Sequence, residues 1–318
     1  MPNKTPILLT GASGFVGSAL ATVLLEQGEH LICPVRSGSP ATTERLRQPC
    51  IGDISTSTDW HPYLNGTGVV IHCAARVHVM HDTASDPLAA FRAMNVDATL
   101  HLAREAAAAG VSQFIFLSSV KVNGEQTPAG RPFKENDASQ AQDPYGISKR
   151  EAEQALLALG RESGMAITII RPPLVYGPGV KANFASMMHW VKKGIPLPFA
   201  SIHNQRSLVY IGNLLSLIVC CLRNPDAAQQ IFLVSDGEDL STADLLRQCA
   251  AALGVRSRLF PCPPQWIRIA ASLAGRPGIA ERLCSSLQVD IHKAQTLLGW
   301  TPPYSVAQGL SATAASFR

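Results

Sequence analysis

The sequence is poor in charged residues and lacks the patterns of a metal-binding or nucleic-acid-binding protein. Only 16% of its 318 residues are charged, whereas 46% are hydrophobic, and the net charge is +4. The basic residues are spread along the chain without a run of five, so no nucleic-acid partner is expected. None of the eight cysteines forms a C-x-x-C pair, so no zinc site is expected either.

Long apolar segments are also absent from the sequence. A short Ile7–Leu9 run precedes a glycine turn, which does not resemble a signal peptide. The most apolar later run, Leu214–Leu222, is too short to span a bilayer. We therefore expect a soluble, cytoplasmic protein without a membrane partner, and a composition this hydrophobic allows it to bury a large core.

Short apolar runs alternate with helical patterns through the first half of the chain. Buried strands are predicted at 6–9, 30–35, 69–73, 113–117 and 166–170. Helices are predicted at 18–27, 86–109 and 145–159. Continuous apolar strands separated by helices are typical of a parallel sheet that is covered on both faces.

The alternation of strands and helices breaks after Pro172, where proline and glycine become frequent. A helix at 213–223 and a strand at 231–235 follow, and no strand alternation is visible from Glu238 onward. We predict an α/β fold, a doubly wound parallel sheet of the Rossmann type with a smaller, mainly helical C-terminal substrate lobe. The expected domains are 1–171 plus about 207–235 for the sheet, and about 172–206 and 236–318 for the lobe.

A glycine-rich turn links the first predicted strand to the first predicted helix. Gly11, Gly14 and Gly17 are spaced G-x-x-G-x-x-G, and glycines let the backbone approach a pyrophosphate closely. The helix N-terminus offers free N–H groups and a positive dipole end to that anion. An unliganded turn is the alternative, but the position between strand and helix favours a dinucleotide. The predicted contacts are Gly11, Ser13, Gly14, Phe15, Val16 and Gly17.

Other predicted cofactor contacts follow the next two strands. Asp53 can accept a hydrogen bond from an adenine amino group, with Ile54 beside it, and an ordinary loop aspartate is the alternative. Cys73, Ala74 and Ala75 end the third strand with small side chains, as close approach of a cofactor requires. Three histidines, His72, His78 and His81, have no carboxylate or thiol to complete a metal site, so no metal is expected.

A serine, a tyrosine and a lysine form the predicted catalytic site. Ser119 ends a strand, where open α/β sheets present their chemistry. Tyr145 and Lys149 are four residues apart on one helix face. An ammonium and a positive nicotinamide ring favour the phenolate form of tyrosine, which makes Tyr145 an acid/base for an alcohol–ketone couple. Ser119 can hold the substrate oxygen, and Lys149 can bind the nicotinamide ribose.

With these motifs the chain resembles the extended short-chain dehydrogenases, specifically the nucleotide-sugar epimerase/dehydratase/reductase family. The matches, in family order, are Gly11, Gly14, Gly17, Gly52-Asp53, Ala74-Ala75, Asn95-Val96, Ser118-Ser119, Tyr145, Lys149, Arg171-Pro172, Val175–Pro178 and Arg206. The resemblance implies a nucleotide-sugar substrate and adds Asn95, Ser118 and Pro172 to the cofactor contacts.

The resemblance also assigns the substrate contacts. It implies that Asn183 and Arg206 hold the uracil side and the diphosphate of the substrate. A positioned guanidinium suits a diphosphate, although a surface ion pair is the alternative for Arg206. A second diphosphate arginine has no clear counterpart before Asp290–Lys293.

Departures from the family pattern narrow the chemistry. Val120 and Lys121 follow Ser119, where the dehydratases carry an Asp-Glu pair, so 4,6-dehydration is disfavoured. The segment Ser119–Gly124 most resembles a bacterial subgroup linked to surface-polysaccharide sugars, which includes 4-ketoreductases and 4-epimerases. A homodimer is left open.

The choice between reductase and epimerase depends on the cofactor. Arg36 ends the second predicted strand, where an arginine accommodates the 2′-phosphate of NADP. No carboxylate is expected beside it, and Ser37 and Ser39 can add hydrogen bonds. We therefore predict NADPH over NAD, and a UDP-4-keto-(6-deoxy)-hexosamine 4-reductase over a UDP-hexose or UDP-N-acetylhexosamine 4-epimerase with retained NAD. A non-catalytic NAD(P)-sensing regulator is the third reading.

Overall fold

The computed structural model describes residues 5–38, 40–77, 86–128, 130–273, 275 and 277–317. In these residues an eight-stranded sheet has the order β10-β7-β6-β5-β1-β2-β4-β3, and only β3 runs antiparallel to its neighbour. The strands are β1 (Ile7–Thr10), β2 (Leu31–Ile32), β3 (Ala41–Thr42), β4 (Leu46–Gln48), β5 (Val69–His72), β6 (Gln113–Leu117), β7 (Ala166–Arg171) and β10 (Gln230–Leu233). The predicted α/β class and doubly wound parallel sheet are confirmed.

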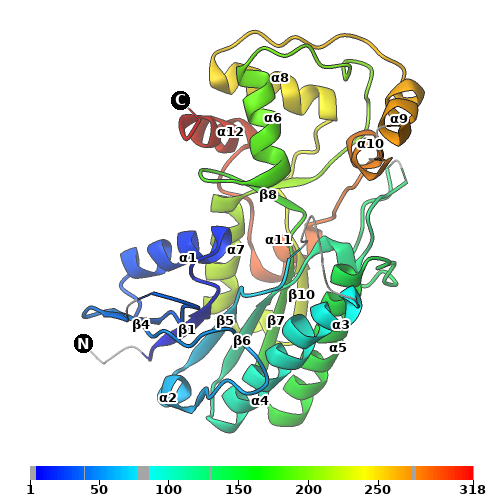
Figure 1. Cartoon of the computed structure of the whole chain (residues 1–318). Coiled ribbons are helices and arrows are strands. Elements are labelled where there is room, and N and C mark those ends of the chain that lie inside the picture. The colour runs from blue at the N-terminus through cyan, green and yellow to red at the C-terminus, as the bar shows by residue number, and fades with distance from the viewer. Residues whose placement is uncertain are drawn as a thin grey trace.

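Helices cover both faces of this sheet, as the two sides of Figure 1 show. One face carries α1 (Phe15–Glu26) and α7 (Ile211–Arg223), and the other carries α4 (Thr99–Ala108) and α5 (Pro144–Ser163). The strands are apolar throughout because both of their faces are buried. In β1, Ile7 and Leu9 pack with the α1 and α7 side, whereas Leu8 packs with the α4 and α5 side.

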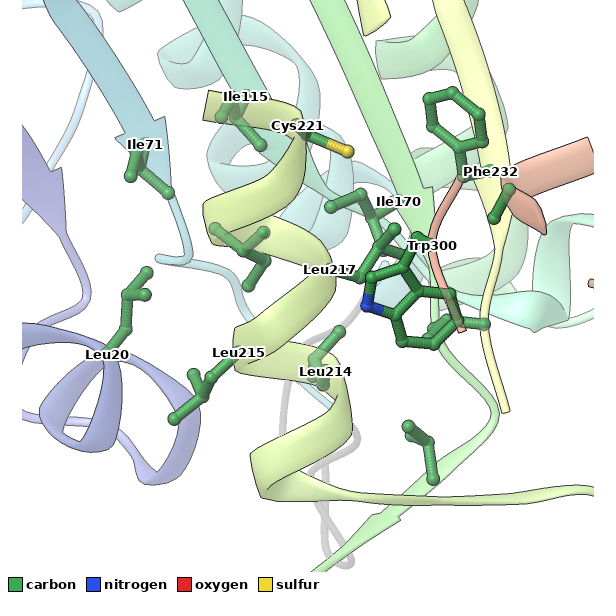
Figure 2. Close-up of a cluster of buried hydrophobic side chains, with 14 of the residues drawn as sticks. Leu20, Ile71, Ile115, Ile170, Leu214, Leu215, Leu217, Cys221, Phe232 and Trp300 are labelled. Atoms are coloured by element: carbon green, nitrogen blue, oxygen red, sulfur yellow. The ribbon is translucent and has the colours of Figure 1, made fainter. Parts of the chain in front are cut away.

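Helix α7 supplies much of the first of these cores. Figure 2 shows Leu214, Leu217 and Cys221 on α7 directed toward side chains of the central strands and toward Trp300. The apolar run Leu214–Leu222 thus belongs to a buried core helix. An apolar run of this length is typical of such a helix and is too short for a membrane span.

The helical prediction for 86–109 is correct in extent, but the segment is not one regular helix. It consists of α3 (Pro87–Arg92), the π-helical η1 (Ala93–Ala98) and α4. The strand predicted at 30–35 is reduced to the two residues of β2, and β3 and β4, which were not predicted, form the edge of the sheet. The β-propensity of the residues does not predict a strand of two residues, because such a strand forms only through pairing with a neighbouring strand.

A second group of elements sits above the carboxyl ends of the strands (Figure 1). Strands β8 (Leu174–Tyr176) and β9 (Leu208–Tyr210) pair in parallel there. The helices are α6 (Ala182–Lys192), α8 (Thr242–Leu253), α9 (Pro264–Leu273), α10 (Pro277–Cys284) and α12 (Val306–Ala315). Its core includes Tyr176, Phe184, Met188 and Leu310.

One part of the segment assigned to the lobe lies instead against the sheet. Helix α11 (His292–Leu298) carries Lys293, whose Nζ donates to the carbonyl of Ile231 in β10 at 2.9 Å. Ala294 and Trp300 belong to the core that α7 supplies. Strand β10 is an edge strand of the sheet, and this segment covers its apolar face on the side where α7 packs. The other domain boundaries stay predictions.

Among the described residues no helix is long and apolar enough to cross a bilayer. No group of His, Cys, Asp and Glu in that part could hold a metal ion. His72 is buried and bonds through its two ring nitrogens to Thr10 Oγ1 at 2.7 Å and Thr99 Oγ1 at 3.0 Å. Burial lowers its pKa to about 3, so it is a neutral core residue. His78, His81 and Ser39 lie outside the described residues.

Candidate active site

The glycine turn packs tightly against the end of β5. Gly11 has φ +73°, and a Cβ on it would lie 2.7 Å from the Ala74 nitrogen. A Cβ on Gly17 would lie 2.1 Å from the Gly11 carbonyl oxygen. Both positions therefore require glycine. Helix α1 begins after Gly14 without a side-chain cap, so the N–H groups of its first turn face the turn and can bind an anion.

A cavity of about 1140 Å³ opens in front of this turn. That volume exceeds the usual range of small-ligand pockets and suits a dinucleotide. Most of the predicted cofactor residues line it, namely Gly11, Ser13, Gly14, Phe15, Val16, Gly17, Arg36, Asp53, Ile54, Cys73, Ala74, Ala75, Ser118, Tyr145 and Lys149. The uncapped helix end and the glycine cradle both fit the pyrophosphate of NAD(P).

Two predicted cofactor contacts, Asn95 and Pro172, are not among the residues that line the cavity. The Asn95 side chain is buried and is bonded to the main chain of Arg76 at 2.8 and 3.0 Å and to Ser148 Oγ at 3.0 Å. The Pro172 carbonyl accepts from the Val120 N–H at 3.0 Å. In this arrangement Asn95 positions the wall residue Arg76, and Pro172 positions the strand end that carries Ser119.

The expectation that no carboxylate lies beside Arg36 is wrong. Arg36 Nε lies 2.7 Å from Asp53 Oδ1, and both side chains are largely exposed. The error arose because Asp53 is distant in sequence and approaches Arg36 only when the loop after β4 folds back along the sheet, as the Val35–Cys50 bridge shows. Both residues line the cavity, so the carboxylate would repel a 2′-phosphate placed there.

The serine, tyrosine and lysine come together at the carboxyl end of β6. Asp143 caps α5 by accepting from the N–H groups of Tyr145 and Gly146, each at 3.1 Å. Lys149, one turn later, donates through Nζ to the Leu117 carbonyl at 2.8 Å. Ser119 begins the 3₁₀ turn η2 (Val120–Val122) directly after β6. The structure thus brings Tyr145, Lys149 and the strand end together beside the cavity.

Lys149 is buried against aromatic rings. Its Nζ lies 4.3 Å from the centroid of the Phe116 ring and 6.0 Å from that of the Tyr145 ring. Burial lowers the pKa of Lys149 to about 8, and interactions with Cys73 and with the charge of Glu153 oppose that shift. The ammonium form is therefore present below about pH 8 and is lost as the pH rises further.

The Tyr145 phenol is desolvated in the same place. Burial raises the pKa of Tyr145 to about 12, and a hydrogen bond with Ser119 opposes that rise. The neutral phenol is then the resting form, which can donate a proton to a substrate oxygen. A positive group bound next to it lowers the pKa of the phenol and makes proton removal easier. The arrangement suits acid and base chemistry at an alcohol or ketone.

A buried ion pair, not singled out from the sequence, supports these residues. Glu153 lies two turns after Tyr145 on α5, and its Oε2 is 2.6 Å from Arg171 Nη2 at the end of β7. Glu153 also accepts from the Ser118 hydroxyl. Arg171 donates in addition to Asn123 Oδ1 at 3.0 Å. Four segments around the catalytic residues are therefore tied to one buried charge pair. The signal in the sequence was a glutamate four residues after Lys149.

Lys121, which stands where a dehydratase acid would be expected, is engaged elsewhere. Its Nζ lies 3.0 Å from Glu125 and 3.1 Å from Asp143, the residue that caps α5. It therefore stabilises the start of the helix that carries Tyr145. This is consistent with the sequence-based argument against 4,6-dehydration.

The predicted substrate residues lie in the upper part of the molecule. Asn183 is exposed in the first turn of α6. Arg206 is half-buried, and its Nη1 donates to the carbonyls of Arg282 at 2.8 Å and Ser285 at 3.0 Å. Neither residue lines the cavity described above. That cavity is the expected cofactor site, and residues that contact only the substrate can lie outside it.

The electrostatics of Arg206 favour an anion. Burial and the neighbouring charge of Arg282 both lower its pKa. In the described part of the chain Arg206 forms no ion pair, so the surface ion pair considered for it is not found there. Arg282 brings a second positive charge beside Arg206, which the sequence analysis did not find. It was overlooked because it lies eight residues before Asp290 and not directly in front of that motif.

Comparison with known proteins agrees with this geometry. The model of a family described as the NAD dependent epimerase/dehydratase family matches residues 7–235, which is more than half of the chain. A UDP-glucose 4-epimerase from Vibrio cholerae is 48% identical over 313 residues, covering 98% of this chain and 95% of that protein.

Two solved structures are similar over nearly the whole chain. A UDP-glucuronic acid 4-epimerase from Bacillus cereus, in complex with NAD, has a TM-score of 0.79 at 22% identity, covering 98% of this chain and 96% of that one. A UDP-glucose 4-epimerase from Thermotoga maritima, with UDP-glucose, has a TM-score of 0.74 at 23% identity, covering 98% of each chain. At these identities the likeness establishes the fold alone.

Proposed function

The chain belongs to the NAD-dependent epimerase/dehydratase family, and from that premise we propose that it is a nucleotide-sugar 4-epimerase. It would retain NAD(H) and invert the C4 hydroxyl of a UDP-hexose or UDP-N-acetylhexosamine. The observation that carries the proposal is the identity of 48% to a UDP-glucose 4-epimerase, combined with Tyr145 and Lys149 beside the cofactor cavity. The link to surface polysaccharide rests on the sequence resemblance.

Each catalytic residue has a distinct part in this reaction. Bound in the cavity, NAD supplies the acceptor and donor of hydride. Tyr145, in the phenolate form that a positive group bound beside it favours, takes the proton of the C4 hydroxyl, and the phenol so formed returns it to the C4 oxygen after the keto sugar has turned over. Ser119 holds that oxygen by a hydrogen bond, which strengthens as charge develops on it. Lys149, fixed by the Leu117 carbonyl at 2.8 Å, keeps positive charge near the phenol.

The order of the two leading readings is reversed by these findings. The sequence favoured an NADPH-dependent 4-reductase because Arg36 was expected to stand without a carboxylate. Since Asp53 lies 2.7 Å from Arg36, that preference loses its main support. The reductase stays the second candidate because the exposed Arg36 still lines the cavity and could leave Asp53 to meet a 2′-phosphate.

The proposal is tested by incubating the purified protein with UDP-glucose and, separately, with UDP-N-acetylglucosamine, without added cofactor. We expect NAD(H) to be released when the protein is denatured, and each sugar nucleotide to be converted to a mixture with its C4 epimer. Protein that arrives without cofactor and consumes NADPH with a 4-keto sugar nucleotide would establish the reductase instead. Absence of both reactions, with NAD(P)H still bound, would favour the regulator.

The substrate contact of Arg206 is also a proposal, together with those of Arg282 and Asn183. Arg206→Ala is expected to raise KM for the nucleotide sugar by roughly ten- to a hundredfold, because a charge-assisted contact with the diphosphate is lost. The NAD(H) content should not change. Steady-state kinetics with UDP-glucose measure this change in KM. Arg206→Lys should have a KM between those of the unaltered protein and Arg206→Ala, because lysine keeps the positive charge but loses the two-pronged hydrogen bonding of the guanidinium.

The matched control is Arg223→Ala, since Arg223 is an exposed arginine on α7, remote from the proposed contact. Its kinetics should equal those of the unaltered protein. If Arg206→Ala weakens the use of free galactose as much as that of the UDP-sugar, Arg206 does not bind the diphosphate.

A further inference from the structure

Helix α9 presents an apolar stripe to solvent. Trp266, Ile269 and Leu273 are 64%, 50% and 85% exposed, and their spacing of three and four residues places them on one side of the helix. The helix already has a buried side, where Ile267 packs with Ala280 of α10 and with Ile202. The outer stripe is therefore a second apolar face, which the described residues leave uncovered.

The stretch around this stripe is basic. No aspartate or glutamate occurs in the sequence between Asp244 and Glu281. Arg256, Arg258 and Arg268 are exposed, and in the part of the chain that is described none of them forms an ion pair. Phe260, which lies in the sequence between Arg258 and the start of α9, is 45% exposed. We call the exposed residues Arg256, Arg258, Phe260, Trp266, Arg268, Ile269 and Leu273 the α9 face.

We propose that the α9 face docks on the surface of an anionic lipid bilayer. A helix with tryptophan and aliphatic side chains on one side and arginine beside them is the pattern of a segment that lies in the plane of the interface. Arginines without carboxylate partners complement anionic headgroups, whereas a second copy of this face would bring like charges together. Docking of this kind needs no segment long enough to cross the membrane.

The position of α9 gives this contact a consequence for the enzyme. Helices α9 and α10 lie on one side of the upper part of the molecule, at the right in Figure 1, and the connection from α8 crosses the top of the molecule to reach α9. The end of α10 touches Arg206, which donates to the carbonyls of Arg282 and Ser285. Docking through α9 would therefore hold the substrate end of the molecule at the membrane and leave the sheet in solution.

The test is co-sedimentation of the full chain with vesicles of equal parts phosphatidylcholine and phosphatidylglycerol, against vesicles of phosphatidylcholine alone. We expect binding to the anionic vesicles only, weakened by salt because of screening. Trp266→Ser/Leu273→Ser should lower the affinity by roughly tenfold or more, since two apolar contacts are lost. Arg256→Gln/Arg258→Gln/Arg268→Gln should abolish the preference for anionic vesicles.

Trp190→Ser is the matched control, because Trp190 is an exposed tryptophan on α6, outside the α9 face. It should bind vesicles like the unaltered chain, and all variants should keep their unfolding temperature and their turnover of a soluble nucleotide sugar. Equal binding by the Trp266→Ser/Leu273→Ser variant, or no binding by the unaltered chain, overturns the proposal. A dimer in lipid-free solution that this variant dissociates also overturns it, in favour of a second copy as the occupant.

Discussion

Tyr145→Phe is expected to lower turnover by roughly 10²–10⁴-fold, the usual contribution of a positioned acid or base. The substitution removes one hydroxyl and keeps the ring, so the edge contact with the Phe91 ring at 6.1 Å should persist and the fold should survive. In the proposed reaction the phenol is the group that exchanges a proton with the C4 oxygen, and no other side chain is proposed for that role. The rate constant for interconversion of UDP-glucose and UDP-galactose measures the loss.

The NAD(H) content and the unfolding temperature of this variant should match those of the unaltered protein. Tyr63→Phe is the matched control, because Tyr63 is a half-buried tyrosine on the short helix α2 (His61–Leu64), which does not line the cavity. Turnover near that of the unaltered protein in Tyr145→Phe would remove the phenol from the mechanism.

Glu153→Gln is expected to destabilise the chain by about 3–5 kcal/mol, the usual cost of leaving a buried charge without its partner. The side chains of Glu153 and Arg171 are 3% and 7% exposed, so water cannot replace the lost carboxylate. Urea unfolding measures the free energy. The double variant Glu153→Gln/Arg171→Gln should lose less than the sum of the two single variants, since it leaves no unpaired charge.

The same substitution should change the pH profile of turnover. The charge of Glu153 raises the pKa of Lys149, which burial has lowered to about 8. Without that charge the ammonium form is lost at a lower pH, so the alkaline limb of turnover should shift to lower pH. A protein that is only less stable would show no such shift. If the alkaline limb of the pH profile does not shift, Glu153 has a structural role alone.

Glu151→Gln is the control for both measurements. Glu151 lies on the same helix and pairs with Arg92 at 2.7 Å, but this pair is partly exposed at the surface. Water screens such a pair, so its loss should change stability far less. The pH profile should also stay in place, because Glu151 is not among the groups that shift the pKa of Lys149.

The fold class and the centre of the site could be predicted because their signals are local. Apolar runs of β1, β5, β6 and β7 are buried on both faces, so hydrophobicity alone marks them. Gly11 and Gly17 stand at a turn whose backbone admits no Cβ. Tyr145 and Lys149 share a helix face through the helical repeat alone. In each case the physical cause acts within a few residues.

What the sequence by itself determined is therefore the doubly wound sheet, the glycine turn and the spacing of tyrosine and lysine, because backbone sterics and helical periodicity fix them locally. Only the tertiary structure decided which charges meet. Asp53 reaches Arg36 across 17 positions, Glu153 reaches Arg171 across 18, and Arg282 comes beside Arg206 across 76. Those contacts depend on how the chain packs, since charged residues so far apart in the sequence become neighbours only in the folded structure, and no local pattern specifies which of them meet.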